Sequence, residues 1–296
     1  MSDCTFTTLS FRTSVKRNQA FRFIPLGDQH CASKGHDAGR YRETLQECKR
    51  DPAALFAFMG DEHDLASFSE RRALRNANLH ESTLHDLDQR ALDKCREFVD
   101  QHAWMKGRIA FVLQGNHYWR FSSDSPDDQV RSGQTSTQWV AAQLGAQWAG
   151  WLTYCRLFID AAGSSSGASI DIVASHGKAG GKLVGTPYNQ VAELRGIFPA
   201  ADIYLMGHDH KRGAVPDSSL YMSYSNATGQ GVLKQRRQWM CRTGSYLRGY
   251  VPGEDGYIVG RLLRPAELGN IRFEIALLRQ RKGGEDALVS DVRCWA

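Results

Sequence analysis

Short apolar runs recur along the first two thirds of the chain, and several stop abruptly at a polar residue. Runs rich in aromatic and aliphatic side chains occupy residues 21–26, 54–59, 109–113, 170–174 and 202–206. Runs of this length and composition are typical of strands buried in a sheet. Each is followed within two residues by a polar side chain, and in open α/β sheets ligands bind where such strand-end loops converge. The pattern therefore predicts a polar site at the carboxyl ends of the strands.

Between these predicted strands, apolar residues recur at spacings of three and four, which is the period of an amphipathic helix. This spacing predicts helices at residues 39–49, 82–102, 135–144 and 189–197. The polar stretch 65–81 is ambiguous, and we interpret it as a helix that lies over the site.

The pattern becomes rich in strand-forming residues beyond Leu220, where it predicts strands at residues 221–225, 256–263 and 271–278. The small residues at 161–168 predict the tip of a hairpin between two strands. No internal repeat and no long low-complexity tract interrupts the chain. We therefore predict one domain over residues 1–296, with a motif-bearing core at about 21–211 and a β-rich part at about 212–296.

The composition is that of an ordinary globular protein, with 42% hydrophobic and 23% charged residues among 296. Lys and Arg number 37 against 32 Asp and Glu, which gives a formal net charge of +5. This mild excess is compatible with phosphate-bearing partners but does not establish nucleic-acid binding.

The seven cysteines include no CxxC pair, and an odd number of scattered cysteines indicates reduced thiols. The first 17 residues lack an apolar core of signal-peptide length. No window approaches the run of about 18 apolar residues that a membrane span requires. These features predict a soluble cytoplasmic protein without a membrane partner.

The polar residues at the strand ends form an ordered series of five blocks. Taken singly, each block is a weak signal, because Asp after Gly is usually a turn or helix-cap residue. In chain order the blocks are Asp28-Gln29-His30, Gly60-Asp61-Glu62-His63-Asp64, Gly115-Asn116-His117, His176 and Gly207-His208-Asp209-His210.

Together these blocks read DxH, GDxxD, GNH, H and GHxH, a series that resembles the calcineurin-like metallophosphoesterase superfamily over about residues 21–211. The segments 176–181 and 203–210 are similar to the bacterial and phage branch described as exonuclease-like. The resemblance implies an α/β fold, a four-layer αββα sandwich in which two mixed β-sheets lie face to face with helices outside. The C-terminal strands would complete the second sheet.

The resemblance also implies a dinuclear metal site. Carboxylate, imidazole and amide oxygen form a mixed donor set that suits Mn, Fe, Zn, Ni or Co, and Mn is expected from the habit of the family. The family pattern assigns Asp61 to both metals. It assigns Asp28, His30 and His210 to the first metal, and Asn116, His176 and His208 to the second.

The catalytic roles implied by the resemblance fall on His117 and Asp64. A hydroxide that bridges two metals would attack the phosphate in line, and no covalent phospho-enzyme is expected. His117 would give a proton to the departing oxygen, and Asp64 would contact the other ring nitrogen and hold the imidazole protonated.

Three further residues are weaker candidates for substrate contacts. Tyr118 follows His117 where the family usually has Asp or Glu, which should alter substrate contacts and leave the metals intact. His63 is one imidazole more than the site requires, and both a substrate contact and a plain loop residue remain open. Lys178 lies in a glycine-rich loop after His176, where phosphate contact and simple solvent exposure are both open.

The preferred function is a phosphodiesterase, a nuclease that acts on DNA. It depends on the exonuclease-like resemblance and on basic residues near aromatic ones, as a single-stranded nucleic-acid groove requires. The alternative to a nucleic-acid groove is an ordinary solvated charged surface, with the aromatic residues packed in the core. The residues concerned are Arg71, Arg72 and Arg75, then Lys234, Arg236, Arg237, Arg242 and Arg248, with Trp119, Phe121, Trp239, Tyr246 and Tyr250.

Two other functions are weighed. A phosphomonoesterase that acts on nucleotides, small metabolites or phosphoproteins would use the same metals and the same His117. A binding subunit with a silent site would have lost ligands or the acid, whereas this chain retains every predicted metal position. The oligomeric state is not predicted, and a homodimer is left open.

Overall fold

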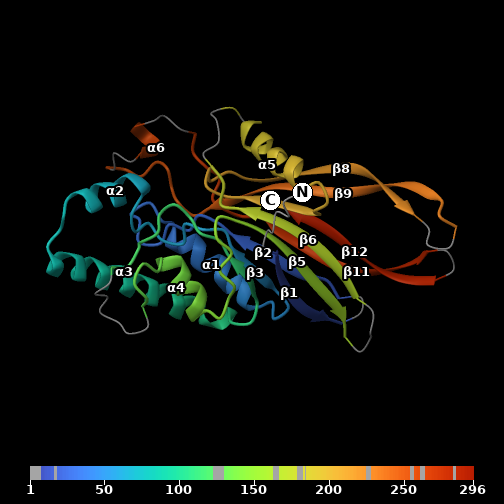
Figure 1. The fold of residues 1–296 in the computed structure, drawn as a ribbon, viewed down its shortest axis with the longest axis horizontal. Helices are drawn as coiled ribbons and strands as arrows, with labels where there is room; N and C mark the ends of the chain where they lie inside the picture. Colours follow the sequence, from blue (N-terminus) through green and yellow to red (C-terminus); the bar gives the residue numbers. More distant parts are fainter. Residues whose placement is uncertain are drawn as a thin grey trace, which may run out of the picture.

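Two β-sheets pack face to face, and helices cover both outer faces of the pair (Figure 1). The computed structural model describes residues 8–16, 19–122, 130–162, 167–178, 183, 185–224, 228–253, 257–260, 264–282 and 285–296 of the chain. None of the helices in these ranges is long and apolar enough to cross a membrane.

The first sheet has five strands in the order β12-β11-β2-β3-β4. Its centre is parallel, because β2 (Phe21–Leu26) pairs with β3 (Leu55–Phe58), and β3 pairs with β4 (Ile109–Val112). The strands β11 (Arg272–Lys282) and β12 (Glu285–Trp295) extend it in antiparallel fashion.

The second sheet has seven strands, and β1-β5-β6-β7-β9-β10 is its main order. The pairs β1–β5, β6–β7 and β7–β9 are parallel, whereas β5–β6, β8–β9 and β9–β10 are antiparallel. Its strands are β1 (Thr8–Val15), β5 (Leu152–Ala161), β6 (Gly167–Ser175), β7 (Ile203–Met206), β8 (Arg212–Tyr224), β9 (Gly231–Ser245) and β10 (Gly269–Asn270).

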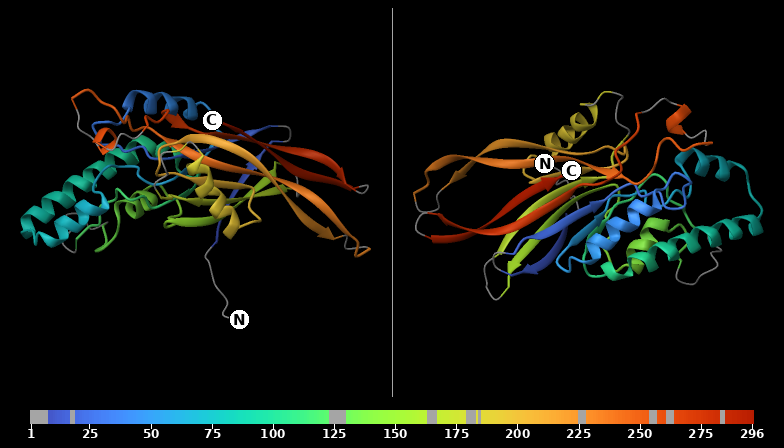
Figure 2. Two further views of the ribbon diagram at one scale, coloured as in Figure 1. Left: turned by 90° about the horizontal axis from the view of Figure 1, so that it is seen from above. Right: turned by 180° about the vertical axis from the view of Figure 1, so that it is seen from behind.

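Three hydrophobic clusters separate the four layers, and their aliphatic and aromatic residues bury the faces that the sequence pattern makes apolar. Between the sheets, Phe23 and Phe111 pack with Leu157 and Leu205. The outer face of the first sheet packs against α1 (Ala38–Lys49), α3 (Glu81–His102) and α4 (Ser136–Gln143). The outer face of the second packs against α5 (Thr186–Ile197), as the views from above and behind also show (Figure 2). The predicted four-layer α/β fold with two mixed sheets is confirmed.

The central strands and the main helices lie where the sequence pattern predicts them, with ends that differ by up to three residues. The predicted strand at 256–263 is wrong, since α6 (Tyr257–Gly260) occupies its described part. A short apolar run fits a strand or a helix turn equally, and periodicity does not distinguish them. The C-terminal strands also divide between the sheets: β8, β9 and β10 join the second, and β11 and β12 extend the first. The local pattern of apolar and polar residues does not indicate which distant strand a given strand pairs with.

A second group of predicted features concerns the thiols and the ambiguous stretch at 65–81. The described cysteines are all free, as the absence of CxxC pairs predicts; they are Cys31, Cys48, Cys95, Cys155, Cys241 and Cys294. The ambiguous stretch contains α2 (Phe68–Asn76), which begins with a capping box between Ser67 and Glu70.

His102 is a buried polar residue at the end of α3 that affects stability. Its Nδ1–H donates to the Phe98 carbonyl at 2.6 Å, and its Nε2 lies 2.7 Å from the Tyr41 hydroxyl. Burial, with a smaller contribution from His63, lowers the pKa of His102 to about 4. The folded protein therefore keeps this imidazole neutral at pH values where an exposed histidine would bind a proton.

We expect this neutral histidine to make the free energy of unfolding fall as the pH drops from about 6.5 towards 4. Over that window the unfolded chain takes up a proton that the folded chain does not, which costs up to about 1.4 kcal/mol per pH unit. Urea unfolding of His102→Gln should show a shallower pH dependence than the wild type. His85→Gln, on the exposed side of the same helix, is the matched control. Equal slopes for wild type and His102→Gln would contradict the assignment.

Candidate metal centre

Loops from both sheets meet at the carboxyl ends of their strands and bring the five predicted blocks together. The loops after β2, β3 and β4 come from the first sheet, and those after β6 and β7 come from the second. Asp28 directly follows the Gly after β2, and His208 likewise follows the Gly after β7. The His208 N–H donates to the Asp28 carboxylate at 3.0 Å, which joins the two sheets at this edge.

Five of the predicted ligands have an unusual backbone conformation, with φ in the left-handed region. Non-glycine residues rarely adopt it, and each costs about 1–3 kcal/mol unless its surroundings hold it in place. Residues with this conformation are concentrated at functional sites, and these five lie together at the ends of the strands. They are Asp28 (φ 46°), His30 (φ 49°), Asp61 (φ 54°), His208 (φ 72°) and His210 (φ 60°).

Backbone hydrogen bonds between the first two loops hold this strained geometry. The N–H of Asp28 donates to Gly60 O at 3.3 Å, and that of His30 donates to Asp61 O at 2.9 Å. The ladder continues from Cys31 to Glu62 at 2.9 Å. The loops after β2 and β3 therefore pair like a short irregular extension of their parallel strands.

Gly60 and Gly115 are required where these loops approach one another most closely. A Cβ atom on Gly60, which has a φ of 92°, would lie 2.7 Å from the Gly115 backbone. A Cβ atom on Gly115 would lie 2.1 Å from both the backbone N and Oδ1 of Asp61. The Gly in the GD and GN blocks therefore has a steric reason.

The first donor set consists of Asp28, His30 and His210, whose ligand atoms all lie within 4.8 Å of one another. The Nε2 atoms of His30 and His210 are 3.1 Å apart, and His210 Nε2 is 3.8 Å from Asp28 Oδ1. Burial, followed by the charge of His30, holds the pKa of His210 well below its ordinary value. Its neutral imidazole therefore directs a lone pair at the same point as the Asp28 carboxylate, which suits a divalent cation.

The second donor set is tighter and centres on the Asn116 amide oxygen. His208 Nδ1 lies 2.6 Å and His176 Nε2 lies 2.8 Å from Asn116 Oδ1, and the two ring nitrogens are 3.2 Å apart. His176 Nδ1–H donates to the Met59 carbonyl at 2.9 Å, which points Nε2 at the site. Burial and the neighbouring His176 lower the pKa of His208 to about 4. These donors form a second convergent N/O cluster.

Asp61 lies between the two sets. Its Oδ2 is 3.3 Å from His176 Nε2 and 3.8 Å from His30 Nε2, while its Oδ1 accepts the His117 N–H at 2.8 Å. Burial alone would raise the pKa of Asp61, but the imidazoles of His176 and His30 outweigh it and hold the pKa far below its usual value. Asp61 is therefore a carboxylate within reach of both donor sets.

Protons compete with a cation for part of this site. Burial would lower the pKa of His176, but Asp61 and Asp28 outweigh it and raise the pKa to about 9. Burial also raises the pKa of Asp28 above its usual value, even though His176 opposes this effect. A metal ion must displace these protons, so cation binding should strengthen as the pH rises.

His117 and Asp64 form a half-buried pair beside the first donor set. His117 Nδ1 lies 2.6 Å from Asp64 Oδ1, and the rings of His117 and His30 are 4.9 Å apart. Burial would lower the pKa of His117, but the contact with Asp64 and the charge of Asp61 raise it overall. Burial would raise the pKa of Asp64, and its contacts with His117 and His30 lower it instead. The contact with Asp64 therefore favours the protonated form of the His117 imidazole.

Arg71 is a site residue whose role the sequence did not reveal. It projects from α2, and its Nη1 donates to the Asn116 carbonyl at 2.8 Å and to the Tyr118 carbonyl at 2.9 Å. Nη1 also donates to the Ala66 carbonyl, and the guanidinium lies over the Tyr118 ring at 3.8 Å. Arg71 therefore fixes the loop that carries Asn116 and His117, which no local motif could show.

The weaker candidates have different outcomes. His63 is buried, donates to the Lys94 carbonyl of α3 at 3.0 Å and packs on Phe98, which favours the plain loop residue, and its contact with substrate stays a prediction. Lys178 is exposed and pairs with Glu193 at 3.0 Å, so its contact with phosphate stays a prediction.

Several of the basic and aromatic residues considered for a nucleic-acid groove have other contacts in the described part of the chain, and the groove itself stays a prediction. Arg242 is fully buried beneath the His208 loop, where it donates to the Gly207 carbonyl at 2.8 Å. Arg236 pairs with Asp202, and Arg248 pairs with Asp37. The aromatic residues Trp119, Phe121 and Tyr246 belong to the core, as the alternative interpretation has it.

Comparison with known proteins gives weak similarities. No family model matches the sequence, and no curated protein matches it. The fold is similar to Vps29 from Entamoeba histolytica, determined in complex with zinc, at 11% identity and a TM-score of 0.34, over 92% of this chain and 98% of that one. Vps29 from Chaetomium thermophilum matches at 7% identity and a TM-score of 0.33, over 93% and 98%. An uncharacterised predicted phosphoesterase from Streptococcus pneumoniae matches at 11% identity and 0.31, over 92% and 99%. Scores this low carry no functional argument, so the interpretation depends on the geometry of the site.

We expect Asp61→Ala to abolish the binding of both metal ions, because Asp61 is the one carboxylate within reach of both donor sets among the described residues. His117→Ala removes a side chain outside both sets and should keep both ions. Metal analysis of chelator-stripped protein after incubation with Mn²⁺ and gel filtration measures the stoichiometry. Two ions retained by Asp61→Ala would show that the bridging assignment is wrong.

Proposed function

We propose that this protein is a dinuclear metal-dependent phosphoesterase that hydrolyses phosphodiesters, with DNA as the first substrate to test. The observation that carries the proposal is the position of Asp61, whose Oδ2 lies within 3.8 Å of one donor set and 3.3 Å of the other. A carboxylate placed in this way is what two neighbouring divalent ions share. The five-block sequence pattern and the fold agree with this site.

The residues at hand fit two ions. They supply two carboxylates, four imidazoles and one amide oxygen, a mixed set that suits Mn²⁺, Fe²⁺ or Zn²⁺, and we propose Mn²⁺ as the working metal. When bound, such ions lower the pKa of a water molecule and neutralise charge on the phosphoryl oxygens. The ligands proposed are Asp28, His30, Asp61, Asn116, His176, His208 and His210.

The chain itself would manage the leaving group. The Asp64 carboxylate, 2.6 Å from His117 Nδ1, holds the ring protonated and leaves Nε2 as the proton donor. In this role Nε2–H protonates the departing oxygen, a contribution worth roughly 10²–10⁴ in rate. Arg71 keeps the acid in place by binding the carbonyls on both sides of His117. No covalent intermediate with the protein is required.

The choice of a diester depends on the similarity of the His176 and His208 segments to the exonuclease-like branch and on the charge around the site. A monoester carries a second negative charge, which enzymes commonly neutralise with Arg or Lys. Here the Arg71 guanidinium is occupied by loop carbonyls, and Lys178 pairs with Glu193. The Arg71 guanidinium is thus committed to the loop and Lys178 would have to leave Glu193 to meet that charge, an arrangement that favours the diester.

The decisive experiment compares substrates with one preparation of protein. Chelator-stripped protein, with Mn²⁺ added back, is given bis(p-nitrophenyl) phosphate, p-nitrophenyl phosphate and labelled single- and double-stranded DNA. Mn²⁺-dependent cleavage of the diester and of DNA with little monoester turnover is the expected result. Turnover of the monoester alone would move the function to a phosphatase, and inactivity of metal-loaded protein on every substrate would contradict the proposal.

A second prediction separates the proposed acid from the metals. His117→Ala should keep both ions and lose about 10²–10⁴-fold in kcat on a diester with a poor leaving group. The loss should be smaller for a p-nitrophenyl ester, because that leaving group needs little protonation. His85→Ala removes an exposed histidine on α3 and serves as the control. An equal loss on both esters would argue that His117 is structural.

A further inference from the structure

A hollow of about 200 Å³ lies next to the metal centre, beyond Tyr118. At about 30 Å³ per water molecule it holds roughly six or seven waters. A single planar ring system fits this volume, whereas a folded chain does not. The residues that line it are Gln114, Tyr118, Arg120, Gly133, Thr135, Gln138, Trp148 and Trp151.

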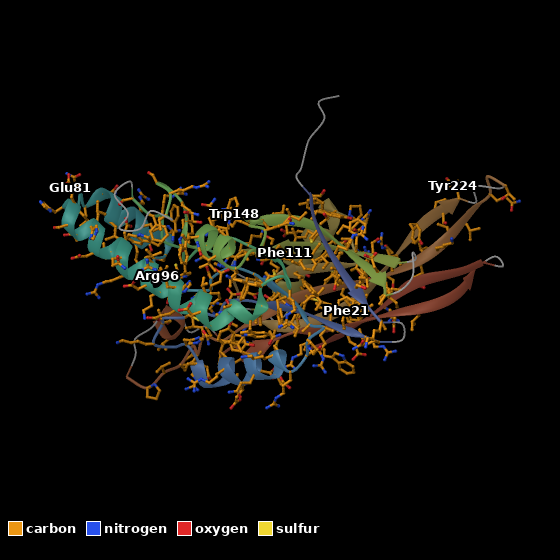
Figure 3. The ribbon with its side chains drawn as sticks, turned by 90° about the horizontal axis from the view of Figure 1, so that it is seen from below. Phe21, Glu81, Arg96, Phe111, Trp148 and Tyr224 are labelled. Carbon is orange, nitrogen blue, oxygen red and sulfur yellow. The ribbon has the colours of Figure 1, made fainter. Side chains whose placement is uncertain are left out.

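Two of the lining residues are tryptophans that remain partly exposed to solvent, Trp148 by 41% and Trp151 by 49% (Trp148 is labelled in Figure 3). Exposed apolar surface that is contiguous and rimmed by polar residues is typical of a ligand-binding groove. Trp151 also meets the Tyr118 ring at a centroid distance of 6.4 Å and an angle of 73°. The hollow is thus bordered by three aromatic rings from two loops.

The tryptophan loop is fixed relative to the metal ligands. Backbone bonds from Val112 to Gln147 and from Gln114 to Gly150, at 2.9 and 2.7 Å, attach it to the open edge of β4. On the other side, the His176 N–H donates to the Trp151 carbonyl at 3.2 Å, and the two rings are 6.3 Å apart. The loop therefore bridges the end of β4 and a proposed metal ligand, so its rings have a defined distance from the reacting phosphate.

The hollow lies on the side of the proposed acid. Tyr118 directly follows His117 in the chain, and it lines both the hollow and the narrow crevice that His117 borders. Because His117 protonates the departing oxygen in the proposed mechanism, the group that enters the hollow belongs to the leaving alcohol. The rim of the hollow is polar. The Arg120 guanidinium lies 6.0 Å from the centre of the Tyr118 ring. The Gln138 side chain accepts the Thr135 N–H through its amide oxygen in the capping box of α4, and that bond does not use its NH₂ group.

We propose that this hollow is a subsite for a nucleobase on the leaving-group side of the scissile phosphate, an inference that rests on the proposed phosphodiesterase function. Aromatic faces stack bases of any sequence, and a polar rim can meet the hydrogen-bonding edge of a base. The subsite selects a nucleoside as leaving group and does not read sequence. It makes a nucleic acid or a dinucleotide a better substrate than a diester of aliphatic alcohols.

The test compares the dinucleotide d(TpT) with two analogues, each of which replaces one base by an abasic tetrahydrofuran residue. The product phosphate shows which nucleoside leaves. Wild-type kcat/KM should be between about fivefold and a hundredfold lower when the leaving side is abasic, the range given by one base stacked on aromatic rings. In Trp151→Ala this ratio should fall to near one, and Trp151→Phe should restore most of it. Trp295→Ala removes a tryptophan that is even more exposed, at the end of β12, and should keep the wild-type ratio.

Outcomes of this comparison separate the two proposals. Equal hydrolysis of d(TpT) and the leaving-side abasic analogue by wild type would overturn the subsite and keep the phosphodiesterase. An equal loss on both substrates in Trp151→Ala would show that Trp151 only supports His176, which also overturns it. Absence of hydrolysis of every diester would contradict the proposed function.

A binding measurement tests whether the subsite exists even if the protein hydrolyses no diester. Thymidine 5′-monophosphate should quench tryptophan fluorescence in the wild type, and 2-deoxyribose 5-phosphate should not. Most of the change should disappear in Trp148→Phe/Trp151→Phe and persist in Trp295→Phe. No base-dependent change in wild-type fluorescence would rule the subsite out.

Discussion

The Asp61 carboxylate is the interaction on which the rest of the site depends. It is buried, and one oxygen accepts the His117 N–H, while the other faces ring nitrogens from two different loops. The loops after β2, β3, β4 and β6 must therefore all be in place before this carboxylate can reach His30, His117 and His176. Its charge also raises the pKa of His176, and it adds to the contact with Asp64 that raises the pKa of His117. Geometry and electrostatics at the centre thus have a common origin.

This arrangement requires a strained backbone, and the fold compensates for the strain outside the site. Left-handed conformations at Asp28, His30 and Asp61 cost free energy in an isolated loop. Here they are stabilised by hydrogen bonds between the loops and by the hydrophobic layer between the sheets, which fixes the strands from which the loops emerge. Because the core supplies this rigidity, the donor atoms stay within about hydrogen-bond distance of one another. A cation that replaces the protons of His176 and Asp28 needs this preformed arrangement, which couples its binding to the folded state.

The sequence predicts the parts of this site that are local. A buried strand followed by Gly-Asp or Gly-His is visible in a short window, and the order of such windows indicated which residues would meet. The predicted ligands do converge. The hydrogen bonds from Arg71 to the Asn116 and Tyr118 carbonyls were not predictable, because they depend on the relative placement of α2 and the loop after β4. The capping box at Ser67 and Glu70 could have located the start of α2, whereas nothing in the run at 256–263 distinguished the helix α6 from a strand.

Tyr118 shows how one side chain can take part in several contacts around the candidate site. An acidic residue in its place would attract the Arg71 guanidinium and draw it away from the loop carbonyls. The Tyr118 ring instead lies under that guanidinium at 3.8 Å and borders the hollow formed with Trp148 and Trp151. A neutral aromatic face there leaves Arg71 free to hold the Asn116–His117 loop. Under the proposed function, the same side chain would both keep the acid in place and border the subsite for the leaving nucleoside.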